Sequence, residues 1–405
     1  MSKKKNTGYV KKASSFVYWI LRAVFKPVLY LLYGFKFDYE SSKDIRQPCV
    51  ILSNHQTVFD QFAIGVGFKF GLNFVATDTI FRHGLLSWFM KVIARPIPYS
   101  RGNQDLPALK NMMYVINNGG SLVLFPSGNR SFFGDESTII PGIGKLVKKF
   151  KAPLVLVQLR GGFNTLPRWK LKPNKGKMTA SVTRVIQSDE LASMAIENID
   201  EAIKKELNFN EFEFNKTQKI IYRGRRKAEY LDSVLFYCPE CRSMTGLYSK
   251  SNEFFCRDCS MKVRINKYGL FEKINKADGI PETILEWSLL QLDYIKSFDF
   301  SGFTNKPLFC DNNVILLKAE RVKKETLLGK GDIKLFADKM NICGQDFLFT
   351  ETTMLVQGIQ KLIIYNKNSV YAVTAPLRTN FVKYMICGYR IRNIILKSEG
   401  DYYGY

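Results

Sequence analysis

The chain has 405 residues, of which 46% are hydrophobic, so it is long enough for one large domain with one or two smaller ones, and wholesale disorder is excluded. The net charge of +24 and the pI near 9.6 are too extreme for an ordinary enzyme of neutral metabolites. They indicate a polyanionic partner, either nucleic acid or an anionic membrane surface.

Residues 1–37 are basic and aromatic, with eight Lys and Arg residues and no acidic one. Arg22, Lys26 and Pro27 interrupt their apolar stretch, whereas a membrane-spanning helix favours about 20 residues with few charges. Arg22 and Lys26 are four residues apart and share a helical face, which leaves the rest of the circumference apolar. We therefore predict a membrane-interface helix region over residues 1–37. A helix that simply packs on the following domain is the alternative.

Residues 38–207 alternate short β-rich runs with longer helical runs, as α/β domains do. The runs expected to form strands are residues 49–52, 73–76, 121–125, 154–159 and 178–186. Helices are expected over about 84–93, from 109 to a stop at Asn118-Gly119-Gly120, and over 188–207. The predicted fold class is α/β, with a mixed sheet flanked by helices.

The rest of the chain changes character. Residues 208–230 are predicted to be a connector that ends in a basic run, Arg223, Arg225, Arg226 and Lys227. Residues 290–405 have several short β-type runs and are predicted to form a small β-rich domain. Those runs are residues 313–317, 347–349, 353–356, 361–365 and 369–373. A lipid-binding module and a β domain that packs on the rest of the protein are both open interpretations.

Four of the eight cysteines, Cys238, Cys241, Cys256 and Cys259, form two Cys-x-x-Cys pairs separated by 14 residues. This spacing is typical of metal ligands and resembles a zinc ribbon, predicted over residues 231–275. Four thiolates would leave zinc no open position, so the predicted metal is structural. The other cysteines occur singly, as in proteins of reducing compartments, and we expect the protein to face the cytosol.

The candidate catalytic pair is His55 and Asp60, in the run Asn54-His55-Gln56-Thr57-Val58-Phe59-Asp60. Histidine is a suitable base near neutral pH, and a carboxylate on its second ring nitrogen would fix the tautomer and stabilise the imidazolium. Residues five apart diverge on a continuous helix, so His55 is expected in the turn before a helix, with Asp60 reaching back from the first turn. The other histidine, His83, has no acid at a comparable spacing and is interpreted as structural.

A second motif, Phe125-Pro-Ser-Gly-Asn-Arg-Ser131, follows about 70 residues after His55, where a predicted strand passes into a loop. A glycine-containing turn presents backbone N–H groups, and Arg130 offers a planar, permanently charged fork. Both suit a phosphorylated acceptor. An ordinary strand-ending turn with a solvated arginine is the alternative.

Together these motifs resemble the lysophospholipid acyltransferase family. Residues 54–60 are similar to its first block, Asn-His-x-Ser-x-x-Asp, with Thr57 in place of serine. Arg101 lies where the second block has an arginine assigned to acceptor binding. Residues 125–131 are similar to the third block, Phe-Pro-Glu-Gly-Thr-Arg-Ser, and residues 152–155 to the start of the fourth. The resemblance covers roughly residues 16–207.

The resemblance implies an O-acyltransferase in which His55 is the general base and Asp60 orients it. The implied donor is an acyl thioester, acyl-CoA or acyl carrier protein, and the implied acceptor is a lysophospholipid, first of all lysophosphatidic acid. The implied substrate-binding residues are Arg101, Ser127, Gly128, Asn129 and Arg130. The implied location is peripheral or monotopic, on the cytoplasmic face of an anionic membrane.

Two departures from the family pattern leave the acceptor open: Ser127 replaces a glutamate and Asn129 a threonine. The alternative function is an inactive acyltransferase-like membrane scaffold whose zinc ribbon binds protein or nucleic acid. The intact His55 and Asp60 disfavour this alternative, and nucleic acid is the less favoured partner. Acyl chain length, the position acylated and the oligomeric state are not encoded in any recognisable motif.

Overall fold

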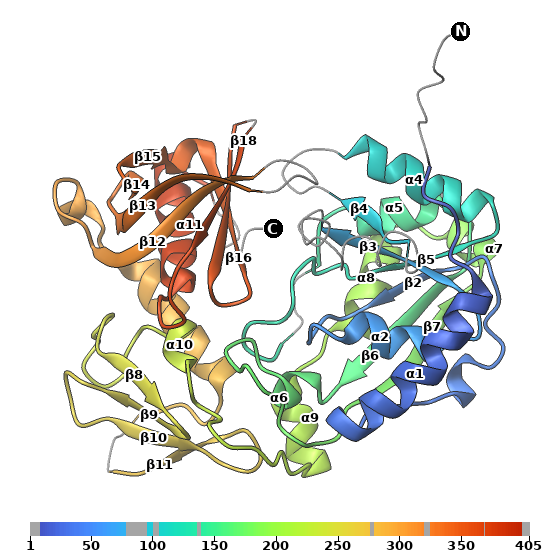
Figure 1. Ribbon diagram of the computed structural model, residues 1–405, viewed down its shortest axis with the longest axis horizontal. Helices are drawn as coiled ribbons and strands as arrows, with labels where there is room; N and C mark the ends of the chain where they lie inside the picture. The colour runs from blue at the N-terminus through green and yellow to red at the C-terminus, as the bar shows by residue number, and fades with distance from the viewer. Residues whose placement is uncertain are drawn as a thin grey trace, which may run out of the picture. The chain divides into compact units, whose positions relative to one another are not determined.

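The computed structural model describes residues 9–77, 95–99, 105–135, 139–275, 279–319, 325–367 and 369–398. The chain forms two compact units, whose elements are drawn in Figure 1. The first unit consists of Met1–Ser131, Asp135–Gly162 and Lys177–Glu211, and the second of Phe132–Gly134, Phe163–Gly176 and Phe212–Tyr405. The boundaries expected from the sequence at 38, 207, 230 and 290 stay predictions.

The first unit is built on a seven-stranded sheet of order β1-β7-β6-β2-β5-β3-β4. Its strands are β1 (Lys36–Phe37), β2 (Val50–Ser53), β3 (Leu72–Thr77), β4 (Ile97–Tyr99), β5 (Ser121–Leu124), β6 (Leu154–Arg160) and β7 (Thr179–Ile186). Neighbouring strands are parallel except for the antiparallel pair β6 and β7. The predicted mixed α/β fold is confirmed.

Helices cover both faces of this sheet, which explains why its central strands are continuous apolar runs. Along β2, Val50 and Leu52 join one buried cluster and Ile51 joins the other, because successive side chains point to opposite faces. Helices α4 (Leu106–Asn117), α5 (Ile143–Lys149) and α8 (Ile196–Leu207) supply side chains to the first cluster, and α1 (Ser15–Tyr33) and α2 (Asp60–Gly65) to the second.

The predicted helix over 188–207 is wrong in one respect, because the structure has two helices there. α7 (Ser188–Ser193) ends before Met194, and Ala195 has an extended backbone with ψ of 152° before α8 begins. The sequence carries no Gly or Pro at this break, so no local signal marked it. The predicted helix over 84–93 lies outside the described residues.

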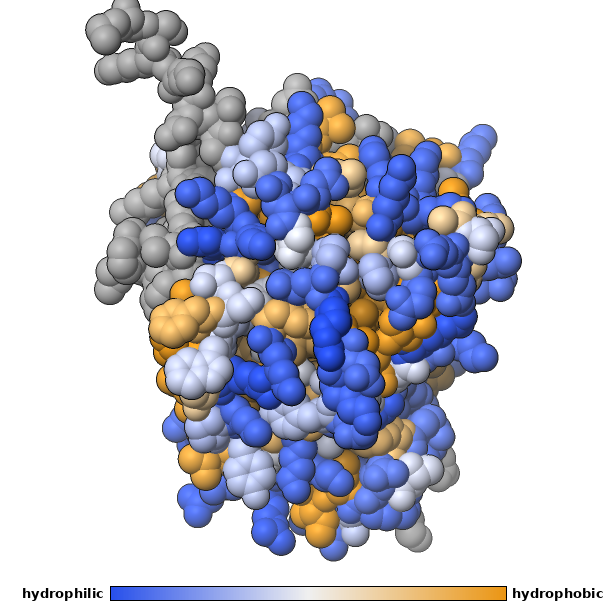
Figure 2. Space-filling model, turned by 90° about the vertical axis from the view of Figure 1, so that its right-hand side faces the viewer, coloured by the Kyte–Doolittle hydropathy of each residue, from blue (hydrophilic) through white to orange (hydrophobic). Residues whose placement is uncertain are grey.

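Helix α1 has one face on the first unit and another exposed. Tyr18 and Leu29 are buried, while Phe16, Trp19 and Leu31 are exposed by 70%, 66% and 72%. Figure 2 shows one face of the molecule, where apolar side chains lie among hydrophilic ones. Among the described residues α1 alone is long and apolar enough to cross a membrane; the criterion is length and composition only, which core helices and signal sequences also satisfy.

The second unit contains two antiparallel sheets. The smaller has the order β11-β10-β9-β8 and the larger β15-β14-β13-β12-β18-β17-β16. The strands of the small sheet are β8 (Leu247–Lys250), β9 (Glu253–Cys256), β10 (Lys262–Ile265) and β11 (Phe271–Lys273). Those of the large sheet are β12 (Phe309–Ala319), β13 (Thr326–Leu335), β14 (Lys339–Ile342), β15 (Gln345–Leu348), β16 (Thr352–Gln357), β17 (Lys361–Asn366) and β18 (Ser369–Thr374). The expected β-rich C-terminal region is confirmed.

The described part of the second unit also holds α10 (Ile284–Ser297), α11 (Phe381–Leu396), and all but the first residue of α6 (Gly162–Thr165) and of α9 (Glu211–Gln218). The sequence did not predict α11. Its first nine residues are all buried, so it lacks the polar face from which an amphipathic helix is recognised. Asn380 caps it by accepting a hydrogen bond from the backbone N–H of Lys383.

Candidate functional site

Two loops meet at the carboxyl edge of the first unit's sheet. β2 and β5 are parallel neighbours, so the segments that follow them, 54–60 and 125–131, leave the sheet at the same edge. The backbone N–H of Ser131 donates to the carbonyl of His55 at 2.8 Å. The rings of His55 and Phe125 are stacked, with centroids 4.1 Å apart and planes inclined by 19°. The sheet therefore joins two motifs that lie far apart in the sequence.

His55 and Asp60 form a hydrogen-bonded pair. Nδ1 of His55 lies 2.7 Å from Oδ2 of Asp60, with the histidine in the turn after β2 and the aspartate at the first position of α2. This is the geometry expected from their spacing. When Nδ1 donates to the carboxylate, the lone pair of the neutral ring is on Nε2, which is the nitrogen that can accept a proton.

The carboxylate of Asp60 is fully buried and has several further donors. Its Oδ2 accepts from the backbone N–H of Gln56 at 2.5 Å and of Thr57 at 2.9 Å, and its Oδ1 accepts from the Thr57 hydroxyl at 2.6 Å. Burying an ionised carboxylate is costly unless it is hydrogen-bonded in this way. Thr57 thus retains the hydroxyl of the serine that it replaces.

A second set of contacts fixes the catalytic turn to the sheet. The side-chain amide of Asn54 both donates to the carbonyl of Leu159 at 2.8 Å and accepts from its N–H at 2.7 Å, in the manner of one more strand residue. Gln56 Oε1 accepts from Gly162 N–H at 2.8 Å. Buried Glu211 accepts from Gly161 N–H at 3.1 Å and lies 3.4 Å from Gln56 Nε2.

The sequence did not single out Glu211. It lies in the predicted connector, in a run of alternating Asn, Phe and Glu residues without a recognisable motif. Only its burial and its contacts distinguish it from Glu213, which is exposed and paired with Lys216 at 2.9 Å.

The loop after β5 is a tight turn. Gly128 has φ of 64° and its N–H donates to the carbonyl of Phe125 at 2.9 Å, so a residue without a side chain suits this position. The buried Ser127 hydroxyl donates to the carbonyl of Asn129 at 2.9 Å. Where the family has a glutamate, this chain therefore has a side chain that closes the turn. Asn129 Nδ2 is buried without a hydrogen-bond partner in the described part of the chain.

Arg130 brings a cation to the same edge. Burial lowers the pKa of Arg130, and the negative charge of Asp60 raises it. The guanidinium is therefore desolvated and close enough to Asp60 to interact with its charge. An arginine guanidinium keeps its charge at neutral pH even when burial lowers its pKa. Arg101, the second predicted arginine, lies outside the described residues. The structure thus brings together His55, Asp60 and residues 127–130, whose roles in catalysis and binding stay predictions.

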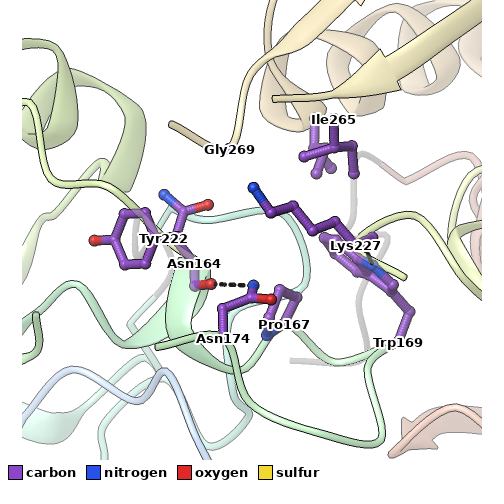
Figure 3. A pocket seen from close by; sticks show the side chains of 9 residues that line it. Asn164, Pro167, Trp169, Asn174, Tyr222, Lys227, Ile265 and Gly269 are labelled. Atoms are coloured by element: carbon purple, nitrogen blue, oxygen red, sulfur yellow. Dashed lines mark hydrogen bonds between the residues drawn. The ribbon is translucent and has the colours of Figure 1, made fainter. Parts of the chain in front are cut away.

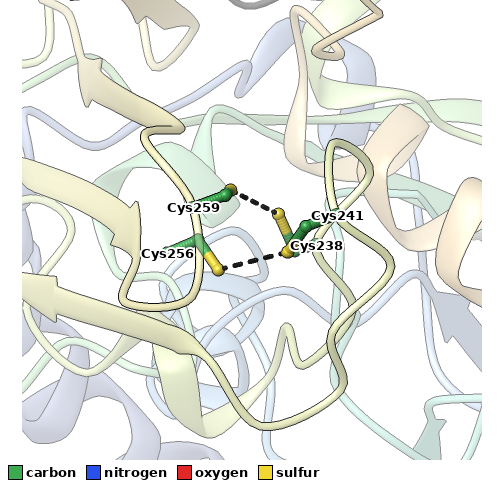
Figure 4. Close-up of side chains that lie close together, drawn as sticks. All are labelled: Cys238, Cys241, Cys256 and Cys259. Atoms are coloured by element: carbon green, nitrogen blue, oxygen red, sulfur yellow. Dashed lines mark hydrogen bonds between the residues drawn. The ribbon is translucent and has the colours of Figure 1, made fainter.

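The four predicted metal ligands also lie together, in the second unit (Figure 4). All four sulfur atoms are within 4.8 Å of one another, with Cys238 to Cys259 at 3.8 Å and Cys241 to Cys256 at 3.7 Å. A zinc ion with four Zn–S bonds of about 2.3 Å places its sulfurs about 3.8 Å apart. The cluster therefore fits a tetrahedral thiolate site.

The part of the chain that holds both loops of the site is similar to a known family. Residues 36–159 match the family model described as Acyltransferase, which confirms the predicted resemblance for the part of the chain that carries His55, Asp60 and Arg130. This segment is similar to the acyltransferase family. Apart from Phe132–Gly134, the second unit lies outside the match.

The names of the similar proteins are more specific than the description of the family model. The chain is 24% identical to 1-acyl-sn-glycerol-3-phosphate acyltransferase of Saccharomyces cerevisiae over 47% of this chain and 64% of that protein. It is 27% identical to a chloroplastic 1-acyl-sn-glycerol-3-phosphate acyltransferase of Brassica napus over 30% and 35%. Both matches cover less than two thirds of the relative. The crystal structure of 1-acyl-sn-glycerophosphate acyltransferase PlsC from Thermotoga maritima is similar over 47% of this chain and 78% of its own, with 19% identity and a TM-score of 0.40.

Proposed function

We propose that the protein is an O-acyltransferase that moves a fatty acyl group from an acyl thioester to the hydroxyl of a lysophospholipid, with lysophosphatidic acid as the first candidate acceptor. The observation that carries the proposal is the His55–Asp60 pair at the carboxyl edge of a parallel sheet, beside the cation of Arg130. The relatives, named for acylation of 1-acylglycerol 3-phosphate, support the same reaction.

In the proposed mechanism, Nε2 of His55 takes the proton of the acceptor hydroxyl as the oxygen attacks the thioester carbonyl. Asp60 holds the ring by Nδ1 and stabilises the imidazolium that forms. The new carbon–oxygen bond replaces the carbon–sulfur bond, and the proton passes from the imidazolium to the leaving thiolate. Because the acceptor attacks directly, no acyl-enzyme intermediate is required.

Acceptor recognition is assigned to the loop after β5. A phosphate is a suitable partner for Arg130, which is half-buried, planar and permanently charged, and the sequence adds Arg101 to the same role. Asn129 Nδ2, a buried donor without a partner in the described residues, is a further group for an acceptor oxygen. Ser127 supplies no carboxylate, so the head group is open to other lysophospholipids.

Two further assignments complete the proposal. Cys238, Cys241, Cys256 and Cys259 would hold a structural zinc ion, which stabilises the fold around them and takes no part in the reaction. α1 would lie in the membrane interface, because its outer face exposes Phe16, Trp19 and Leu31, while Arg22 and Lys26 lie over the ring of Tyr39. The cytoplasmic face is proposed from the lone cysteines only.

The test is an acyl-transfer assay with purified full-length protein, a panel of lysophospholipids, and both acyl-CoA and acyl carrier protein as donors. The expected result is ester formation with at least one acceptor, fastest with lysophosphatidic acid. Transfer that persists unchanged in a folded His55→Asn variant would contradict the mechanism. Transfer to other head groups only would replace the acceptor and leave the mechanism standing.

A further inference from the structure

Two segments of the second unit carry an unusual excess of positive charge. Residues 163–176 contain four basic residues and residues 214–228 contain six, and neither segment contains an acidic residue. The second segment includes the basic run of the predicted connector. Neither segment belongs to the candidate active site or to the cysteine cluster, so the charge calls for an explanation of its own.

The two segments are joined along their backbones. Lys175 and Arg223 exchange hydrogen bonds in both directions, each of 2.7 Å, as an antiparallel pair whose side chains lie on the same side. Nζ of Lys170 donates to the carbonyl of Arg225 at 2.9 Å. The basic side chains of both segments therefore lie next to one another.

Tight packing beneath these residues keeps the segments in place. A Cβ on Gly224 would lie 2.0 Å from Asn174 Oδ1, and one on Gly176 would lie 2.3 Å from the ring of Tyr222. Buried Trp169 donates from its indole nitrogen to the carbonyl of Lys227 at 2.9 Å. Figure 3 shows Trp169, Asn174 and Tyr222 around one small pocket. Close contact at two glycines gives the pair of segments a defined shape.

We name the outer surface of these segments the basic platform. It comprises the basic residues Lys170, Lys172, Lys175, Arg223, Arg225 and Arg226 and the exposed aliphatic residues Leu171 and Ile221. Within the described ranges, none of its six basic side chains has an ion pair with a carboxylate. Carboxylates nearby are already paired, Glu229 and Asp232 with Arg378 at 2.8 and 3.0 Å. The platform's charge is thus not neutralised within the second unit.

The surroundings of Lys170 affect its proton binding. Burial, and then the positive charge of Lys227, lower the pKa of Lys170 to about 8. Like charges held together on a rigid surface repel one another, and an anionic partner would relieve that repulsion.

We propose that the basic platform is a docking site for the anionic head groups of a lipid bilayer, separate from α1. The charges would contact head groups, and Leu171 and Ile221, exposed by 62% and 39%, would enter the interface between them. Two contacts on one chain would strengthen attachment, because the second engages at a high effective concentration. This proposal stands whether or not His55 is catalytic.

Nucleic acid is the competing partner of a basic surface, and the side chains of the platform disfavour it. Binding of single strands combines basic residues with exposed aromatic rings on which bases stack. Here the aromatic residues of the two segments nearest the charges, Trp169 and Tyr222, are each 1% exposed, and the exposed apolar residues are aliphatic. Aliphatic side chains between cations suit a lipid interface better than a base.

The test compares two full-length variants that lose the same charge. The platform variant carries Arg223→Gln, Arg225→Gln and Arg226→Gln. The control carries Lys296→Gln, Lys339→Gln and Lys367→Gln in the same unit, where each lysine is exposed or half-buried and paired with an acid. Both keep α1. Binding is measured on phosphatidylcholine vesicles with and without about 30% phosphatidylserine, whose surface attracts basic residues.

The platform variant is expected to bind anionic vesicles 10- to 100-fold more weakly than wild type, since each basic residue at such a surface contributes roughly fivefold. The control is expected to lose less than about threefold, and neutral vesicles should not distinguish the proteins. Hydrogen exchange should show residues 219–227 protected on anionic vesicles. Equal losses in both variants, no loss in either, or a defect seen with RNA instead of vesicles would overturn the proposal.

Discussion

The candidate active site and the cysteine cluster differ in how they bring distant parts of the chain together. Each joins two short motifs that are separated in the chain. In the first unit, the parallel pairing of β2 and β5 brings the motifs together, and the reactive ring of His55 keeps a side-chain exposure of 19%. In the second, the sulfurs converge on one another, and Cys238 is fully buried. We expect a site assembled by a sheet to survive loss of its reactive group, and a site that depends on a bound metal to be lost with that metal.

The largest expected effect concerns the cysteine cluster. The Cys256→Ser variant should lose about one zinc ion per chain and several kcal/mol of unfolding free energy, since structural zinc contributes on the order of 10 kcal/mol in small zinc domains. Metal content by atomic emission and thermal unfolding measure this. Cys310→Ser, at an exposed single cysteine, is the control. Full stability in the metal-free protein would show that no metal assembles the cysteine cluster.

The second largest effect is expected on the reaction rate and not on stability. His55→Ala should lower kcat/KM about 10³-fold, because a general base contributes 10²- to 10⁴-fold, while thermal stability changes little. Steady-state acyl transfer and a melting curve test both halves of this expectation. The matched variant is His83→Ala, at the other histidine of the chain, with activity within a few-fold of wild type. A large loss of stability in His55→Ala would make the histidine structural instead.

The Asp60→Asn variant tests whether Asp60 orients the ring of His55. The amide cannot accept hydrogen bonds at both positions where the carboxylate does, so the ring of His55 would lose its fixed tautomer and the imidazolium its counter-charge. We expect kcat to fall about 10²- to 10³-fold with a smaller change in KM, in the same assay. Asp44→Asn changes an exposed carboxylate and should change neither constant. A fall in substrate affinity alone would move Asp60 from catalysis to binding.

The smallest effect concerns Thr57. Thr57→Val removes the 2.6 Å hydrogen bond to Asp60 Oδ1 at nearly constant volume, which should reduce kcat about tenfold, as hydrogen bonds to charged groups contribute about 1.5–3 kcal/mol. Thr57→Ser keeps the hydroxyl and should restore activity to within about twofold. If the serine variant loses activity and the valine variant does not, the methyl group and not the hydroxyl matters at this position.

The sequence was sufficient for features that depend on neighbours along the chain. Residues 54–60 and 125–131 and the four cysteines were recognisable because their spacing is itself the geometric requirement. Strands such as β2 and β6 were predicted within one residue of their bounds, since continuous apolar runs are typical of strands buried on both faces. Because His55 and Asp60 are five positions apart, their contact required a turn followed by a helix, which the structure contains.

Features that depend on contacts between distant residues were not recognisable. Glu211 lies beside Gln56 only because of the tertiary fold, since the two residues are 155 positions apart in the chain. The break between α7 and α8 has no Gly or Pro, and α11 lacks a clear polar face because its first nine residues are all buried. All three features depend on tertiary contacts, which local sequence preferences do not reveal.

The sequence by itself thus determined which residues are candidates for catalysis and for metal binding and how the charge is distributed, because residue type and short spacing fix those properties. Only the tertiary structure decided that Asp60 is buried among four donors, that Ser127 closes its own turn, and that segments around Lys175 and Arg223 form one surface. The physical reason is that these pairings are set by packing summed over a whole unit, and no local stretch of sequence contains that sum.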